Sequence, residues 1–225
     1  MKVKDRMTTN VKTVDYEASI TTAFSLMKEN SIRRLPVMDK GKIVNIITLS
    51  DLNQVTPSLA TTLSVYELNY LLAKTKIKDV LPKRRKLLTI GPEDYIETAA
   101  RIMRQNTVSG LPVVDDFGNL VGIITETDIF DALIHILGVY QPHSRIDIYT
   151  EDRPGGLHQI AGLISGKGIN ILNIVAYYDQ KKGKYKIILR LASLDCNDLV
   201  EELKQHGYEI ESVAIKEISE EPIFL

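Results

Sequence analysis

Two short segments pair a hydroxyl with a carboxylate at the same spacing. Thr48 precedes Asp51 by three residues, and Thr125 precedes Asp128 by three residues. Such a pair is typical of a capping box, in which both side chains accept hydrogen bonds from backbone N–H groups at the start of a helix. The same residue types also suit a ligand, because a helix start favours a phosphate and a carboxylate accepts hydrogen bonds from a ribose diol. A single pair favours capping, whereas the duplication favours a ligand, and both interpretations stay open.

The other residues that could do chemistry do not form a catalytic set. The four histidines lack the spacing of a metal site, and Cys196 has no partner at the spacing of a metal or redox motif. The stretch 161–168 lacks the first glycine and the Ser or Thr of a phosphate-binding loop, and no Gly-x-Ser-x-Gly segment occurs. The sequence therefore predicts a protein that is not an enzyme and that has neither a metal site nor a catalytic cofactor.

Composition narrows the class of protein. The 225 residues carry 28 Lys and Arg against 29 Asp and Glu, a net charge of −1, which argues against a nucleic-acid partner. The single cysteine excludes an intrachain disulfide. No apolar run approaches the ~18 residues of a membrane span, and the first residues do not resemble a secretory leader. We therefore expect a cytoplasmic protein with no membrane partner.

An internal repeat organises the first part of the chain. Thr13-Val14 recurs as Thr89-Ile90, and 35–37 (Leu-Pro-Val) recurs as 111–113, in both cases 76 residues later. The Thr-x-x-Asp pairs are 77 residues apart, so one residue has been inserted between these landmarks, at a turn where insertion is tolerated. Repetition of this kind indicates two copies of one structural unit.

Hydrophobic periodicity predicts the same elements in each copy, in the order strand, helix, strand, strand, helix. The predicted hairpins are 35–38 with 42–48 and 111–114 with 120–125, and the closing helices start at 50 and 126. A unit of ~55 residues buries little core alone, so the two copies are expected to pair.

The pattern changes after about residue 144. It predicts strands at 145–149, 170–178, 184–191 and 209–216, with helices at 157–164 and 197–206. This βαββαβ order is the ferredoxin-like arrangement. The predicted boundaries are 1–60 for copy 1, 61–76 for a connecting helix, 77–137 for copy 2, 138–143 for a linker, 144–218 for the C-terminal domain and 219–225 for a tail.

The repeat resembles a tandem pair of CBS domains. The stretch 122–128 matches the closing pattern Gly-apolar-apolar-Thr-x-x-Asp of that family in full, whereas Asn45 stands at the glycine position of copy 1. The resemblance implies a regulatory site for an adenosyl nucleotide, namely AMP, ADP, ATP or S-adenosylmethionine, between the copies. It assigns ribose to Asp51 and Asp128, and phosphate or ribose to Thr48 and Thr125. It assigns the base to Thr13, Val14, Thr89, Ile90, Ser109 and Gly110.

Two arginines set the copies apart. Arg33 and Arg34 occupy the positions that match Ser109 and Gly110 in copy 2. A guanidinium at position 34 suits a polyphosphate, although exposure beside a strand explains it equally well. The difference indicates that the two sites prefer different ligands.

The C-terminal domain resembles the ACT domain. The resemblance rests on the segment Asp152-x-Pro-Gly-x-Leu157 and on the segment 168–171, Gly-Ile-Asn-Ile. It implies a dimer contact, or a small-effector site in which the N–H groups of Gly155, Gly156 and Leu157 hold a carboxylate and Asn170 holds an amino group. The order CBS, CBS, ACT resembles regulators of the acetoin utilisation protein B type.

The sequence thus predicts an α/β (α+β) chain made of a CBS pair and a ferredoxin-like ACT domain. The expected function is non-catalytic sensing of an adenosyl nucleotide by a homodimer that regulates an unidentified protein partner. Three alternatives remain: a scaffold with empty clefts, an enzyme that converts a nucleotide, and a DNA-binding regulator that uses the basic run 83–86.

Overall fold

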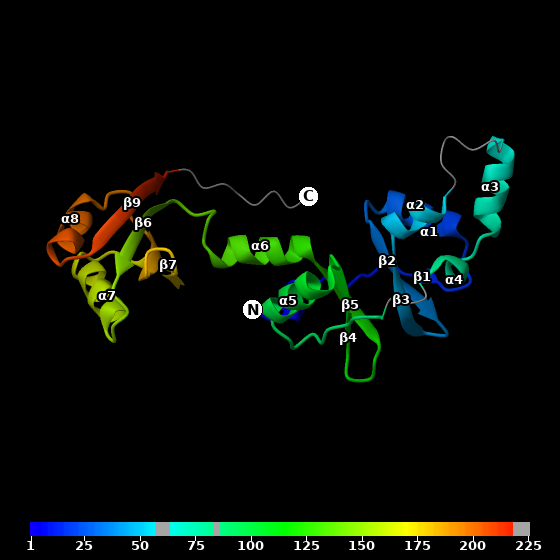
Figure 1. Ribbon diagram of the computed structural model, residues 1–225, viewed down its shortest axis with the longest axis horizontal. Helices are drawn as coiled ribbons and strands as arrows, with labels where there is room; N and C mark the ends of the chain where they lie inside the picture. The colour runs from blue at the N-terminus through cyan, green and yellow to red at the C-terminus, as the bar shows by residue number, and fades with distance from the viewer. Residues whose placement is uncertain (57–63, 83–85, 218–225) are drawn as a thin grey trace. The chain divides into compact units, whose positions relative to one another are not determined.

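The computed structural model describes residues 1–56, 64–82 and 86–217 (Figure 1). It divides into two compact units, Met1–Ile129 and Phe130–Leu225, which are treated separately below. Three residues of the basic run, 83–85, and the predicted tail fall outside the described residues. Within the described part of the chain, no helix is both long and apolar enough to cross a membrane.

Copy 1 is a small sheet with helices packed against it. Its elements are β1 (Val14–Asp15), α1 (Ile20–Glu29), β2 (Arg34–Asp39), β3 (Lys42–Thr48) and α2 (Leu49–Val55). β2 pairs antiparallel with β3 and parallel with β1. The buried side chains at i, i+3 and i+7 of α1 are Ile20, Ala23 and Met27, as the periodicity predicts. The predicted hairpin and both helices of copy 1 are confirmed.

Copy 2 repeats this arrangement with one element reduced. Its elements are α5 (Ile96–Asn106), β4 (Gly110–Val114), β5 (Leu120–Thr125) and α6 (Glu126–Ile136). The predicted first strand is wrong here, since only one parallel bridge, Ile90 to Val113, remains. In copy 1 the Tyr16 N–H donates to the Met38 carbonyl at 2.8 Å, whereas Pro92 stands at the equivalent position and has no N–H to donate.

A second repeat, not recognised in the sequence analysis, precedes each copy. The segment 2–5, Lys-Val-Lys-Asp, recurs as 76–79, Lys-Ile-Lys-Asp, 74 residues later. These residues form the short helices η1 (Val3–Asp5) and α4 (Ile77–Val80), and α3 (Val65–Lys74) lies ahead of the second. We call residues 1–8 and 75–82 the lead-in segments.

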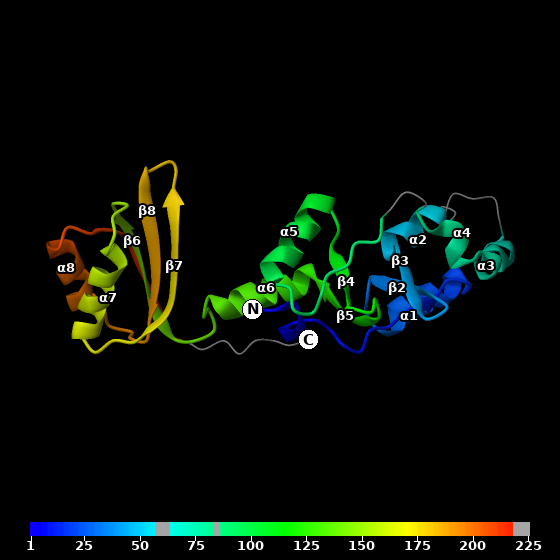
Figure 2. The same cartoon turned by 90° about the horizontal axis from the view of Figure 1, so that it is seen from below.

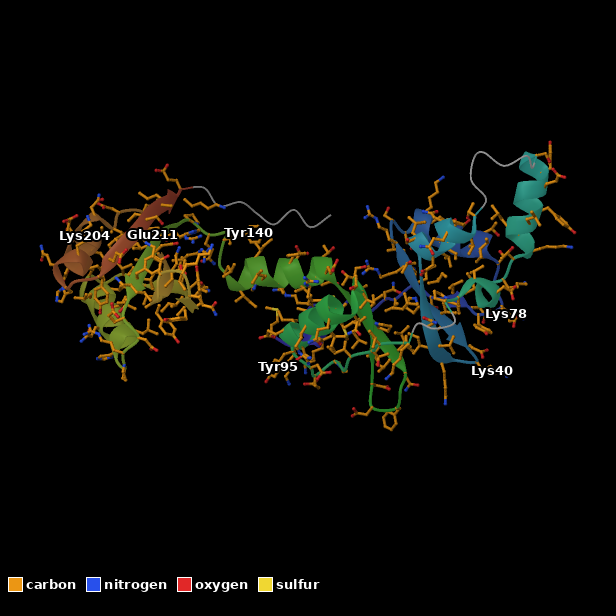
Figure 3. All side chains as sticks on the ribbon, viewed as in Figure 1. Lys40, Lys78, Tyr95, Tyr140, Lys204 and Glu211 are labelled. Atoms are coloured by element: carbon orange, nitrogen blue, oxygen red, sulfur yellow. The ribbon has the colours of Figure 1, made fainter. Side chains whose placement is uncertain are left out.

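Each lead-in segment completes the other copy. The Val3 N–H donates to the Asp94 carbonyl of copy 2 at 2.8 Å, and the Ile77 N–H donates to the Ala18 carbonyl of copy 1 at 2.9 Å. Ile77 is fully buried in the core of copy 1. Figures 1 and 2 show the blue N-terminal segment beside α5, and Figure 3 marks Lys78 on α4. The two copies therefore fold as one unit through exchanged segments.

The second unit contains a four-stranded antiparallel sheet in the order β7-β8-β6-β9. Its elements are β6 (His143–Thr150), α7 (Gly156–Gly166), β7 (Ile171–Asp179), β8 (Lys184–Leu191), α8 (Asn197–Gln205) and β9 (Glu209–Lys216). Both helices lie on the same face of the sheet (Figure 2), where Ile146, Ile160 and Leu189 are fully buried. The predicted βαββαβ order is confirmed.

The opposite face of this sheet carries a network of ion pairs. The Asp147 carboxylate, whose side chain is 4% exposed, contacts Arg145 Nε at 2.6 Å and Lys186 Nζ at 3.1 Å. Lys186 also pairs with Glu211, and Figure 3 marks Glu211 on β9. Desolvation, followed by the nearby Asp179 and Glu211 carboxylates, raises the pKa of Tyr149 to about 12. This face is thus neutralised by its own residues.

Candidate functional site

The two Thr-x-x-Asp pairs start helices in the structure. In copy 1, Asp51 Oδ2 accepts hydrogen bonds from Thr48 N at 2.9 Å and from Thr48 Oγ1 at 2.7 Å, and the Asp51 N–H donates back to Thr48 Oγ1 at 3.2 Å. In copy 2, Asp128 Oδ2 accepts from Thr125 N at 2.7 Å and from Thr125 Oγ1 at 2.8 Å. The capping interpretation is therefore confirmed at both pairs. The ribose and phosphate roles stay predictions.

Strand register brings four of the predicted residues to the junction of the copies. Arg34 pairs with Thr48 across β2 and β3, and Gly110 pairs with Thr125 across β4 and β5. The Arg34 guanidinium reaches across and donates to the Ser109 carbonyl and, at 2.8 Å, to Ser109 Oγ. A Cβ atom at position 110 would collide with Arg34 Nη1, so a glycine is required there. The repeat-related positions 34 and 110 thus contact each other.

Burial makes the charge of Arg34 costly, and carboxylates of copy 2 offset part of that cost. Loss of water lowers the pKa of the Arg34 guanidinium, whereas the charges of Glu126 and Asp128 raise it. A guanidinium remains protonated under all ordinary conditions. Arg34 therefore places a fixed positive charge at the junction.

A cavity of about 1310 Å³ opens at this junction within the unit Met1–Ile129. Three cationic side chains line it, Arg33, Arg34 and Lys86, together with one carboxylate, Glu126. Its polar lining includes Asn45, Thr48, Ser50, Asn53, Gln54, Asn106 and Ser109. Its apolar lining is Ile46, Leu49, Leu87, Leu88 and Val108. The lining can accommodate a molecule with an apolar, flat part and a negatively charged part.

The predicted site residues divide into two sets. Those that line the cavity are Arg34, Thr48, Ser109 and Gly110. Those that do not line it are Thr13, Val14, Asp51, Thr89, Ile90, Thr125 and Asp128. Val14 and Ile90 are each 3% exposed, and Val14 belongs to the core of copy 1, which explains their apolar character without a ligand.

Sequence reasoning missed three amides of the cavity. Asn53 and Gln54 lie in α2 after the cap, and Asn106 ends α5. The signal for the first two was available, because residues one turn beyond a helix start lie near the same end of the strand. Asn106 comes from the other copy, and no local pattern connects it to this place.

Gly122 is a glycine because of the first lead-in segment. A Cβ atom at position 122 would lie 2.5 Å from Met7 Sδ and 3.1 Å from the Thr8 carbonyl oxygen. The sequence analysis linked this glycine to a site for a ligand, and the structure shows that residues of the same chain already fill the space beside it. At the equivalent position, Asn45 lines the cavity.

The predicted effector residues of the C-terminal domain do not meet within one chain. Gly155, with φ +85°, begins α7, while Asn170 follows the far end of that helix. Eleven helical residues separate them, a length of about 16 Å. The expectation that Leu157 joins the buried face of α7 is also wrong, because Leu157 is 46% exposed and Gly156, Ile160 and Ile164 face the core at intervals of four.

Within the described part of the chain, no group of three or more His, Cys, Asp or Glu side chains could hold a metal ion.

Comparison with known proteins identifies the first unit. The CBS-domain family model matches residues 3–56 and 77–135. An uncharacterised protein of Methanocaldococcus jannaschii is 37% identical over 60% of this chain and 92% of its own length. A Vibrio cholerae protein assigned provisionally to acetoin utilisation is 26% identical, with a TM-score of 0.50 over 62% of this chain and 94% of that chain. The Arabidopsis thaliana protein CBSX2, solved with AMP, is 27% identical, with a TM-score of 0.49 over 60% of this chain and 97% of its own. The chain, with its two repeated copies, belongs to the CBS-domain family.

Proposed function

We propose that the protein is a non-catalytic regulator that binds an adenosyl nucleotide in the cavity between its two CBS copies. The observation that carries this proposal is the lining of the cavity. Arg33, Arg34 and Lys86 supply positive charge beside apolar side chains such as Ile46 and Leu87. The volume of about 1310 Å³ exceeds the ~300–1,000 Å³ of common small-molecule sites, so a nucleotide fits.

Each part of a nucleotide has a counterpart among these residues. An adenine ring suits the apolar lining, and phosphates suit Arg33 and Lys86, whose side chains bear the charges that phosphate oxygens bind. The family resemblance assigns ribose to Asp51 and Asp128. At Asp128 a ribose hydroxyl would donate to Oδ1, because Oδ2 already accepts from Thr125.

The regulatory step follows from binding at a junction. A ligand held by residues of both copies favours the arrangement that it binds best, and it changes that equilibrium by the difference in its affinities. We place the readout in a second chain and in an unidentified protein partner. The pathway, including acetoin utilisation, and the cytoplasmic location belong to this proposal.

The C-terminal domain is proposed to be an ACT domain that joins two chains. Its βαββαβ order supports this assignment. Gly155 and Asn170 lie at opposite ends of α7, so an effector site that uses both would need them from two chains. Sedimentation equilibrium should give the mass of a dimer, and a monomer at all concentrations would contradict this part of the proposal.

Thermal unfolding with added ligands tests the proposal. We expect millimolar AMP, ADP or ATP to raise the melting temperature by several degrees, since a ligand at 100 times its Kd stabilises by about 2.7 kcal/mol. Lys86→Ala should reduce the shift, whereas Lys40→Ala, at the exposed hairpin turn marked in Figure 3, should leave it unchanged.

The choice of variant matters because Asp51 and Asp128 cap helices. Replacing either by Ala would remove a cap worth roughly 0.5–2 kcal/mol and would lower stability with or without a ligand. Melting curves that do not move with any adenosyl compound would contradict nucleotide binding and would favour a scaffold function.

A further inference from the structure

The repeat predicts a second cavity that is equivalent to the first. The observed cavity takes Asn45 and Ile46 of β3 from copy 1. The repeat relates these residues to Gly122 and Ile123 of β5. A fully symmetric pair would therefore offer two equivalent nucleotide sites, one beside β3 and one beside β5.

The first lead-in segment covers the β5 side. The Thr8 N–H donates to the Ile123 carbonyl at 3.0 Å, and the Ile123 N–H donates to the Thr8 carbonyl at 3.0 Å. Met7 lies against Gly122, where no Cβ would fit. The backbone that would face a ligand at β5 is thus already paired with residues of the same chain.

The second lead-in segment cannot do the same at β3. The residues that match Met7 and Thr8 are Leu81 and Pro82, because the lead-in repeat has an offset of 74. A proline has no N–H, so the reciprocal pair made by Thr8 cannot form. The Ile46 N–H instead donates to Asn45 Oδ1 at 2.8 Å, and both residues line the cavity.

The charges of the open side select the ligand further. Three cations and one carboxylate line the cavity, and the positions that match Arg33 and Arg34 in copy 2 hold Ser109 and Gly110. Positive lining favours a ligand with two or more negative charges. S-Adenosylmethionine carries a sulfonium cation in place of phosphates, and the same cations repel it.

We infer that each chain binds one nucleotide, at the β3 side only, and that this nucleotide is phosphorylated. The inference rests on the proposed nucleotide-binding function and adds its stoichiometry, its place and its ligand class. Titration calorimetry of the full chain with ATP, ADP, AMP and S-adenosylmethionine tests it. We expect one site per chain for the phosphorylated compounds and an affinity for S-adenosylmethionine at least about tenfold weaker.

A matched pair of cysteine variants locates the site. Gln54 lines the cavity, and the repeat relates it to Asp131, which is also exposed; the native Cys196 is buried. ATP should slow the reaction of a thiol reagent with the Gln54→Cys protein several-fold. It should leave the reaction of the Asp131→Cys protein unchanged.

The outcomes separate the inference from the function beneath it. Two sites per chain, protection of the Asp131→Cys protein, or tighter binding of S-adenosylmethionine than of ATP would each overturn the inference while leaving nucleotide binding intact. No heat with any of the four compounds would overturn the proposed function itself.

Discussion

Gly122 and Asn45 occupy equivalent positions of the two copies, yet each residue follows from a different neighbour. Met7 and Thr8 cross β5 at Gly122 and leave no space for a side chain. Asn45 lies beside the cavity and caps the N–H of Ile46. The family pattern predicted the difference in sequence but not its cause, because the cause lies more than 100 residues away along the chain.

Substitution at this position should show the difference. We expect Gly122→Ala to lower the free energy of unfolding by about 1–3 kcal/mol, because the methyl group overlaps Met7 and the Thr8 carbonyl. Asn45→Ala is the matched control and should change it by less than about 0.5 kcal/mol. Urea denaturation measures both. Equal effects of the two substitutions would contradict the packing of Met7 against Gly122.

The caps show what sequence can supply for single residues. The spacing of Thr48 and Asp51 predicted a local contact three residues apart, and the structure contains it. The contact of Arg34 with Ser109 joins residues 75 apart, and no periodicity encodes it. Local hydrogen bonds were therefore predictable, whereas the arrangement of side chains around the cavity was not.

At the scale of elements, hairpins were predicted best and lead-in segments worst. β3, β5, β8 and β9 have the predicted bounds, because alternating apolar residues between turns mark a strand clearly. The lead-in segments escaped detection because each is short and repeats with an offset of 74 rather than 76. Their attachment depends on partners from the other copy, which local patterns do not contain.

The first lead-in segment should detach more easily in acid. Glu93 contacts Lys2 Nζ at 2.5 Å and Lys4 Nζ at 2.7 Å. Hydrogen bonds from Lys2 and then Lys4 lower the pKa of Glu93 to about 2. A depressed carboxyl pKa stabilises the folded state fully above the unfolded value of about 4.3, and this stabilisation is lost as the pH falls towards the folded value.

Comparison with Glu93→Gln measures this contribution. We expect the variant to unfold at lower urea concentration than the wild type between pH 5 and 7, and the difference to shrink to nothing as the pH falls to about 2. High salt should also reduce the difference, because these charges are exposed. Glu97→Gln, in the same copy, is the control. A difference that persists at pH 2 would contradict the ion-pair explanation.

At the scale of the whole molecule, the chain has two units and all cavity residues belong to the first, Met1–Ile129. The sequence predicted this division from the change in element order after about residue 144. It did not predict which of two equivalent sites is open, since that depends on which lead-in segment can pair with a strand edge.

Calorimetry should separate the units. We expect two unfolding transitions, of which ATP raises only the one that belongs to Met1–Ile129, by about 5–10 °C at 100 times the Kd. The Lys86→Ala protein should show a smaller shift. A shift of both transitions by the same amount would contradict binding within the first unit alone.

The exchanged lead-in segments also affect the order in which the chain can fold during synthesis. Val3, fully buried in the finished protein, is made about 90 residues before Asp94, the residue that receives its N–H. At roughly 5–20 residues per second, this apolar side chain stays without its partner for on the order of ten seconds. Copy 1 meets its own missing piece, Ile77, much earlier. A nascent chain stalled between these two points would hold copy 1 complete with residues 1–8 unoccupied, a form that a chaperone or a second nascent chain can capture.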